Sequence, residues 1–144
     1  MDSYLAKLQK DGDGILVLFP DVPEAITGGE NRDEAFANAR EALELALLTY
    51  VSDGRPIPRA SRRSTAPGQT VWVPVPAAVA AKIAFIVAFR ESGTTRVALA
   101  KKMGKAETEI RRMLDPYHQT KLPAIEAGLH ALGKRLIVSV AEAA

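Results

Sequence analysis

The stretch from Thr95 to Leu114, TRVALAKKMGKAETEIRRML, predicts two short helices around a tight turn. Apolar residues of the first helix are spaced to share one buried face: Ala98, Leu99 and Met103. Gly104 can adopt a positive φ and therefore end this helix. Apolar residues of the second helix recur at steps of three and four: Ile110, Met113 and Leu114. The spacing therefore indicates a helical pair with two facing apolar stripes.

The positions left between these stripes are mostly basic. They are Lys101, Lys102, Lys105, Thr108, Arg111 and Arg112. A short helix pair with a basic outer face is the layout of a helix-turn-helix, whose second helix lies in the major groove of DNA. The alternative is a basic helical hairpin that only packs within a bundle.

Charge divides the chain into an acidic front and a basic back. Residues 1–54 contain 4 Lys and Arg against 11 Asp and Glu, a net charge of −7, whereas residues 55–144 contain 15 against 6, a net charge of +9. A basic segment attracts phosphate, because neutralising each phosphate releases counterions. An acidic segment repels nucleic acid and suits a basic protein partner. The pattern predicts an adaptor between a basic protein and nucleic acid.

Length and composition exclude several classes of protein. The 144 residues suit one domain or two small ones, and the absence of Cys excludes disulfides, thiolate nucleophiles and Cys-ligated zinc. No apolar run approaches the roughly 20 residues that span a membrane. The first residues, MDSYLAKLQKDGDG, are too polar and acidic for a signal peptide. We therefore expect a cytoplasmic protein.

The front of the chain predicts a small antiparallel sheet with one packed helix. Strands are expected at residues 4–9, 15–19, 25–27 and 70–75, and two Asp-Gly pairs between the first two predict a tight turn. Asn31 followed by Glu34 is typical of a helix start. The helix that follows carries one apolar stripe: Phe36, Ala39, Leu43, Leu47 and Tyr50.

The back of the chain predicts an all-helical domain. Residues 55–69, rich in Pro and Arg, are typical of a linker that is mobile when unbound. Residues 77–90 form a helix that is apolar on most sides, so it must be buried in a helical core or against another subunit. A last helix covers 122–132, and a strand at 136–140 lacks a partner. We expect an α+β chain with domains 1–75 and 76–144, at least dimeric.

Two groups of motifs resemble the HicB antitoxin family, in the form that ends in a Cro/Xre-like helix-turn-helix. The front motifs are Phe19-Pro20-Asp21-Val22-Pro23, Thr27-Gly28-Gly29, Asp33-Glu34-Ala35-Phe36 and Ile57-Pro58. The back motifs are residues 99–104, 110–114 and 130–136. The resemblance covers nearly the whole chain in the right order. One departure is the negative charge of Glu107 and Glu109 on the second helix of the pair.

The resemblance implies a partial RNase H-like front domain without RNase activity. It also implies a HicA-type partner, a small basic toxin that cleaves mRNA, and repression of the operon that encodes both proteins. The second helix would begin at Lys105–Glu109 and read DNA. The implied DNA-binding residues are Arg96, Lys105, Glu107, Thr108, Arg111, Arg112, His118, Gln119 and Lys121. For the toxin, we expect contacts from the acidic front: Asp11, Asp13, Asp21, Glu24 and Glu30.

Catalysis by the front domain is not expected. An RNase H site needs carboxylates from different elements that converge on two metal ions. Here Asp11 and Asp13 lie in a tight turn and Asp21 lies between prolines, where Asp serves turn chemistry. Nothing in the sequence indicates a metal, a cofactor or a catalytic residue. The alternative function is a stand-alone regulator whose front domain senses a small molecule, and a neighbouring gene for a small basic protein would favour the antitoxin.

Overall fold

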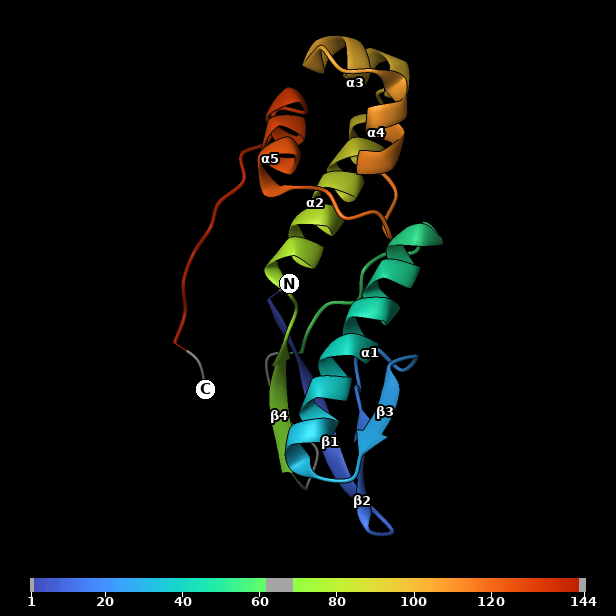
Figure 1. Cartoon of the computed structure of the whole chain (residues 1–144), viewed down its shortest axis with the longest axis vertical. Helices are drawn as coiled ribbons and strands as arrows, with labels where there is room; N and C mark the ends of the chain where they lie inside the picture. The colour runs from blue at the N-terminus through green and yellow to red at the C-terminus, as the bar shows by residue number, and fades with distance from the viewer. Residues whose placement is uncertain (1, 62–68, 143–144) are drawn as a thin grey trace. The chain divides into compact units, whose positions relative to one another are not determined.

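The computed structural model describes residues 2–61 and 69–142. Over these residues the chain forms four strands and five helices (Figure 1). In order they are β1 (Ser3–Asp11), β2 (Gly14–Leu18), β3 (Ile26–Gly29), α1 (Arg32–Ser52), β4 (Gln69–Pro74), α2 (Ala77–Ser92), α3 (Arg96–Met103), α4 (Glu107–Met113) and α5 (Leu122–Ala131). The chain divides into two compact units, Met1–Ala80 and Ala81–Ala144, called here the strand unit and the helical unit.

The strand unit contains one antiparallel sheet with the strand order β3-β2-β1-β4. β1 and β2 form a hairpin in which Asp11 pairs with Gly14, and Gly12 adopts a φ of 58° in the turn between them. β4 pairs with β1 at the opposite edge from β3, so Pro74 lies on an edge strand, where its missing N–H is tolerated. The prediction of four strands is confirmed.

Helix α1 covers one face of this sheet (Figure 1). Its start is confirmed, because the Asn31 side chain accepts a hydrogen bond of 2.9 Å from the Glu34 backbone N–H. Leu43 and Leu47 are fully buried along the predicted stripe. They pack into the core of the unit, whose largest buried side chains include Tyr4 and Phe19. Burial of this apolar stripe is what holds the helix on the sheet.

Gly28 and Gly29 lie within β3, which extends two residues beyond the predicted strand at 25–27. Neither has a positive φ. A Cβ atom on Gly29 would lie 2.5 Å from the backbone nitrogen of Ala35, and one on Gly28 would overlap the carbonyl of Ile15. The two glycines therefore allow the start of α1 and the neighbouring strand to approach the β3 backbone closely.

The helical unit is built around α2, whose apolar side chains are buried within the chain itself. Phe85 is fully buried, and a Cβ on Gly128 of α5 would lie 2.5 Å from its ring. The Thr95 hydroxyl caps α3 by accepting a hydrogen bond of 3.1 Å from the Ala98 N–H. Gly104 ends α3 with a φ of 65°, which confirms its predicted role.

Two predictions about the helical unit need correction. Ala98 is exposed, whereas Ala100 is buried beside Leu99 and Met103 is only half-buried. The buried face of α3 therefore centres on residues 99 and 100. Residues 136–140 form no strand, because no other strand of the described chain pairs with them. For the apolar helix, the structure bears out the first of the two predicted alternatives: α2 is buried in a helical core, where Phe85 lies against Gly128 of α5.

The predicted linker is fixed to the strand unit at its first residues. The Tyr4 hydroxyl donates a hydrogen bond of 2.6 Å to the Pro58 carbonyl, and both the backbone N–H and the hydroxyl of Ser61 donate to Asp21 at 2.7 Å. Gln69 belongs to β4, and residues 62–68 lie outside the described part of the chain. Within the described residues, no helix is both long and apolar enough to span a bilayer.

Candidate functional site

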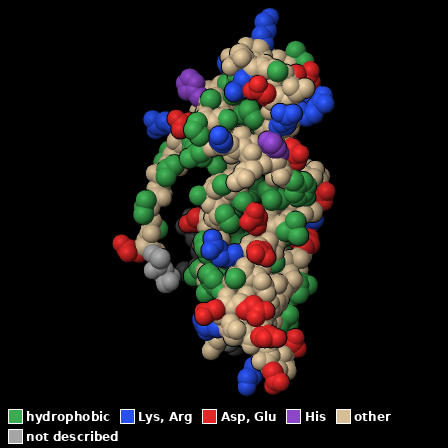
Figure 2. All heavy atoms as spheres, in the orientation of Figure 1, with side chains coloured by type: hydrophobic (Ala, Val, Ile, Leu, Met, Phe, Trp, Pro, Cys, Tyr) green, Lys and Arg blue, Asp and Glu red, His purple; other side chains and the backbone are tan. Residues whose placement is uncertain are grey.

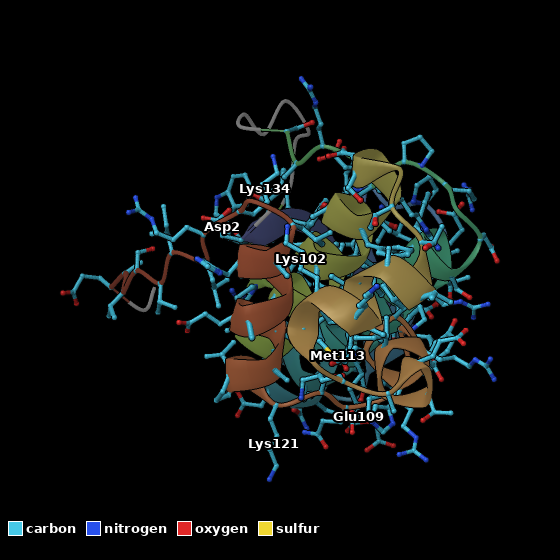
Figure 3. All side chains as sticks on the ribbon, turned by 90° about the horizontal axis from the view of Figure 1, so that it is seen from above. Asp2, Lys102, Glu109, Met113, Lys121 and Lys134 are labelled. Carbon is cyan, nitrogen blue, oxygen red and sulfur yellow. The ribbon has the colours of Figure 1, made fainter. Side chains whose placement is uncertain are left out.

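The nine residues expected to bind DNA all lie in the helical unit; eight of them are exposed and Lys105 is half-buried. They come from three neighbouring places: the start of α3, the turn and helix of α4, and the loop before α5. Seen from above, Lys121 points away from the helices into solvent, whereas Met113 of α4 points inward (Figure 3). On α4 itself, Ile110 and Met113 are buried, whereas Thr108, Arg111 and Arg112 are exposed, so one side of the helix packs on the core and the other faces solvent.

Ion pairs join the start of α3 to the first turn of α4. The Glu107 carboxylate lies 4.0 Å from the Arg96 guanidinium and 3.9 Å from that of Arg111. Lys105 and Glu109 form a second pair at 3.4 Å. All three ion pairs lie at the surface, so each contributes only about 0–1 kcal/mol. They place a cation beside each of the two carboxylates that depart from the family pattern, Glu107 and Glu109.

A buried lysine holds the other end of α4. Lys82, on α2, is only 4% exposed, and its ammonium donates hydrogen bonds to the Met113 carbonyl at 2.8 Å and the Arg112 carbonyl at 3.4 Å. It also bonds the Thr120 hydroxyl at 2.5 Å. A cation at a helix C-terminus is favourable because it satisfies carbonyls that lack intrahelical partners. Lys82 therefore ties the end of α4 and the following loop to the core helix.

Burial has an electrostatic cost for this lysine. Desolvation lowers the pKa of Lys82 to about 8, while the Asp115 charge acts in the opposite direction. The sequence carried a signal that our prediction did not use. Lys82 is the one charged residue in the otherwise apolar run 77–89. A lone Lys in such a run needs oxygen partners when it is buried.

The loop after α4 begins with a side-chain turn. The Asp115 carboxylate accepts a hydrogen bond of 2.9 Å from the Tyr117 N–H, and the His118 N–H donates to the Asp115 carbonyl at 3.2 Å. His118, Gln119 and Lys121 follow as exposed residues. Thr120, between them, is the residue bonded to Lys82. The loop is thus anchored at one point and exposes the side chains on either side of it.

The five acidic residues expected to bind a partner lie in the strand unit but do not form one cluster. Asp11 and Asp13 lie at the β1–β2 turn, and Glu30 follows Gly29, which pairs with Ile15 beside that turn. Asp21 and Glu24 lie in the β2–β3 connection, at the opposite end of β3. Figure 2 shows acidic side chains over much of the strand unit, with Lys and Arg more frequent over α3 and α4.

The two residues of the β2–β3 connection already have partners. Asp21 accepts the two hydrogen bonds from Ser61. Glu24 accepts a hydrogen bond of 2.5 Å from the Tyr50 hydroxyl and forms an ion pair of 3.0 Å with Arg55. These bonds, that of Tyr50 first, lower the pKa of Glu24. Residues 2–61 and 69–142 contain no group of three or more His, Cys, Asp or Glu residues placed to hold a metal ion.

Comparison with known proteins extends over both units. Residues 3–84 match the family model described as HicB_like antitoxin of bacterial toxin-antitoxin system. "Antitoxin HicB 2" of Photorhabdus laumondii is 40% identical over 133 residues, which cover 92% of this chain and 92% of the relative. "Antitoxin HicB" of Escherichia coli K12 is 37% identical over 123 residues, 85% of this chain and 87% of the relative.

A more distant relative is aligned over almost the entire chain. "Antitoxin HicB" of Pseudomonas fluorescens is 29% identical over 140 residues, 97% of this chain and 94% of the relative. The family model covers the strand unit and the start of α2, and the alignments to relatives continue into the helical unit. From these matches, the chain belongs to the HicB-like antitoxin family of bacterial toxin-antitoxin systems.

Proposed function

We propose that this protein is the antitoxin of a type II toxin-antitoxin system, which neutralises a HicA-like mRNA-cleaving toxin and represses its own operon. The division of charge between the units carries this proposal. The strand unit contains 8 Lys and Arg against 11 Asp and Glu, and the helical unit 11 against 6. A basic toxin and a DNA duplex have opposite charges, so each is attracted to a different unit.

The strand unit is proposed to have a partial RNase H-like fold and to bind the toxin without catalysis. The separation of its carboxylates supports this, since Asp21 and Glu24 lie at one end of β3 and the hairpin-turn residues at the other. Two-metal chemistry needs carboxylates a few ångströms apart around both ions. Purified protein with RNA and Mg²⁺ or Mn²⁺ is expected to give no cleavage. Cleavage abolished by Asp11→Ala or Asp21→Ala would contradict this.

The helical unit is proposed to be a Cro/Xre-like helix-turn-helix in which α4 reads the operator. Lys105, Glu107 and Thr108 would lie nearest the base edges at the start of α4. Arg111 and Arg112, further along, would reach bases or phosphates. Phosphate contacts are assigned to Arg96 and to the loop residues His118, Gln119 and Lys121. The exposure of all these side chains except Lys105, on α4 and on the two segments beside it, supports the assignment.

We also propose that the antitoxin is at least a dimer, because a helix-turn-helix protein usually reads two half-sites about one helical turn apart. The segment after α5 supports this proposal. Ile137, Val138 and Val140 are 75%, 74% and 96% exposed, and the segment pairs with no strand of the described chain. Pairing of two such segments around a two-fold axis would cover their apolar side chains.

The proposal is tested by co-expression with the protein encoded by the neighbouring reading frame. The toxin alone should arrest growth, and co-expression of this chain should restore growth and yield a co-purifying complex. Fluorescence anisotropy should then detect binding of the purified antitoxin to DNA from upstream of the operon in preference to a scrambled duplex. Failure to restore growth would contradict the antitoxin role, and equal affinity for both duplexes would contradict autorepression.

A further inference from the structure

We propose that the toxin docks in a groove between β3 and the C-terminal half of α1, called here the Leu45 groove. This inference rests on the antitoxin role proposed above and assigns that role to one surface. The groove has a volume of about 240 Å³. Ile26 and Leu45 form its apolar walls, the small side chains of Ala42 and Ala46 line it between them, and Glu24 and Tyr50 close one end.

The two walls are unusual because they are apolar and largely exposed. Ile26 is 62% exposed and Leu45 is 60% exposed. Leu45 lies outside the stripe with which α1 packs on the sheet, so the fold does not need an apolar residue there. A single exposed leucine needs no explanation, but two large apolar side chains that flank one hollow indicate an interaction site. The groove belongs entirely to the strand unit.

The polar end of the groove is held in one arrangement. The Tyr50 hydroxyl and the Arg55 guanidinium both bind the Glu24 carboxylate, at 2.5 Å and 3.0 Å. The Arg55 guanidinium also stacks over the Tyr50 ring, 4.0 Å from its centre. A binding surface whose polar groups are already ordered loses less entropy when a partner binds. The cluster thus provides a preformed polar rim beside the apolar walls.

Charge selects a basic protein as the occupant. Glu41 is exposed one turn before Leu45 on α1, and the last turn of the helix contains no basic residue. The carbonyl end of a helix carries partial negative charge, and here Asp53 adds a carboxylate at that end. The one cation that lines the groove, Arg55, is already paired with Glu24. The remaining negative groups repel nucleic acid and favour lysine or arginine on a partner. An apolar side chain of the toxin would enter between Ile26 and Leu45 while a basic one lies over Glu41.

The size of the groove favours a side chain over a metabolite. Pockets for small molecules enclose roughly 300–1,000 Å³ and bury most of the ligand. The Leu45 groove is smaller at about 240 Å³, and both of its walls are mostly exposed. A protein partner that covers the groove would bury Ile26 and Leu45 together. Apolar side chains contribute most to affinity when they are fully removed from water in this way.

The test measures the affinity of the full antitoxin for the toxin encoded in the neighbouring reading frame. Because the substituted side chains are largely exposed, Leu45→Lys and Ile26→Lys should fold as the wild type does, which circular dichroism checks. Each should weaken toxin binding by about tenfold or more, as expected for the centre of an interface. Leu45→Met keeps an apolar wall and should bind within about threefold of wild type. Glu41→Lys should slow association, most strongly at low salt.

Trp72→Lys is the matched control, since Trp72 is 42% exposed on β4 at the other edge of the sheet. It should leave toxin affinity unchanged. If the wild type binds and both Leu45→Lys and Ile26→Lys bind equally well, the toxin docks elsewhere and the inference is wrong. If the wild type does not bind, the proposed antitoxin role itself fails. A lower molecular mass for Leu45→Lys without toxin would mean that a second copy of the chain occupies the groove, which would also overturn the inference.

Discussion

At the scale of single residues, Lys82 is the most informative side chain of the helical unit. It is nearly inaccessible, yet it carries a charge that three oxygen atoms from the end of α4 and the following loop surround. Removing one member of such a buried network leaves the others without partners. The position of the proposed reading helix therefore depends on a residue that is buried beneath it.

The lowered pKa of Lys82 predicts how stability changes with pH. An unfolded lysine has a pKa near 10.4, whereas the folded value is about 8. Between these values the unfolded chain binds more protons, so the contribution of Lys82 to the free energy of unfolding rises with pH. Relative to Lys82→Met, the wild type should gain on the order of 2 kcal/mol between pH 7 and pH 10.

Urea unfolding followed by far-ultraviolet circular dichroism at four pH values measures this gain. Lys102→Met is the control, because Lys102 is exposed on α3. The control should show the same pH dependence as the wild type. Parallel profiles for wild type and Lys82→Met would show that Lys82 titrates normally and is not buried as described.

Two substitutions near α4 should have different effects on DNA binding. Lys121→Ala removes a proposed phosphate contact, so it should weaken binding to all sequences alike and reduce the salt slope by about one unit. Thr108→Ala should instead change the ratio of operator to random-DNA affinity by on the order of 1–3 kcal/mol. Fluorescence anisotropy on operator and scrambled duplexes at several salt concentrations separates the two effects.

Substitution of Glu107, like that of Thr108, is expected to change the ratio of operator to random-DNA affinity. Unlike Thr108→Ala, it should also change the affinity for random DNA itself. Its carboxylate lies near both Arg96 and Arg111, so Glu107→Ala frees two cations. Binding to scrambled DNA should therefore tighten while discrimination falls. If substitutions at positions 107, 108, 111 and 112 all leave operator binding unchanged, α4 is not the helix that reads DNA.

At the scale of elements, the contact of α5 with α2 depends on the absence of a side chain. Alanine favours a helix over glycine by about 1 kcal/mol. At Gly128, however, a Cβ would lie 2.5 Å from the ring of Phe85, which is fully buried. Overpacking of this kind costs roughly 1–3 kcal/mol. Gly128→Ala should therefore fail to stabilise the protein and should lower its melting temperature.

The exposed side of the same helix offers a control with the opposite exchange. Ala127 is exposed, so Ala127→Gly should lose only the helix propensity of about 1 kcal/mol. Thermal unfolding by circular dichroism compares the two variants. A higher melting temperature for Gly128→Ala would mean that the Phe85 ring moves aside easily and that the close approach of α5 to α2 does not stabilise the protein.

At the scale of the whole molecule, the apolar segment after α5 should control association. Val138 is 74% exposed in the single chain, so Val138→Lys should disturb a subunit contact without disturbing the fold. Light scattering should show a dimer or larger species for the wild type and a smaller one for the variant. Operator affinity should fall with it, because two half-sites would no longer be bound together. Glu142→Lys, beyond the apolar run, is the control.

The outcome that contradicts this prediction is a wild-type monomer whose mass does not change with concentration. Burial of α2 within its own unit has removed one of the two reasons to expect a dimer. The exposed segment is the reason that remains. A monomer that nevertheless binds the operator would require each copy to bind its half-site independently.

Sequence alone determined the features that depend on neighbours a few residues away. The start of α1 at Asn31 and the end of α3 at Gly104 were both predictable, because caps and turns are set by local backbone and side-chain geometry. Helix α1 and the four strands followed from hydrophobic periodicity for the same reason. The lone lysine in the apolar run of α2 was also visible, although its partners were not.

Tertiary structure decided whatever depends on distances between segments far apart in the chain. Met113 and Thr120, which accept hydrogen bonds from Lys82, lie more than 30 residues away from it in the sequence. No local pattern encodes those contacts. The same holds for the close approach at Gly29, for the separation of the five acidic residues, and for the pairing of Ile26 with Leu45 across one groove. Packing brings such side chains together, because the free energy gained from burying apolar surface depends on how all the segments pack and not on any single residue.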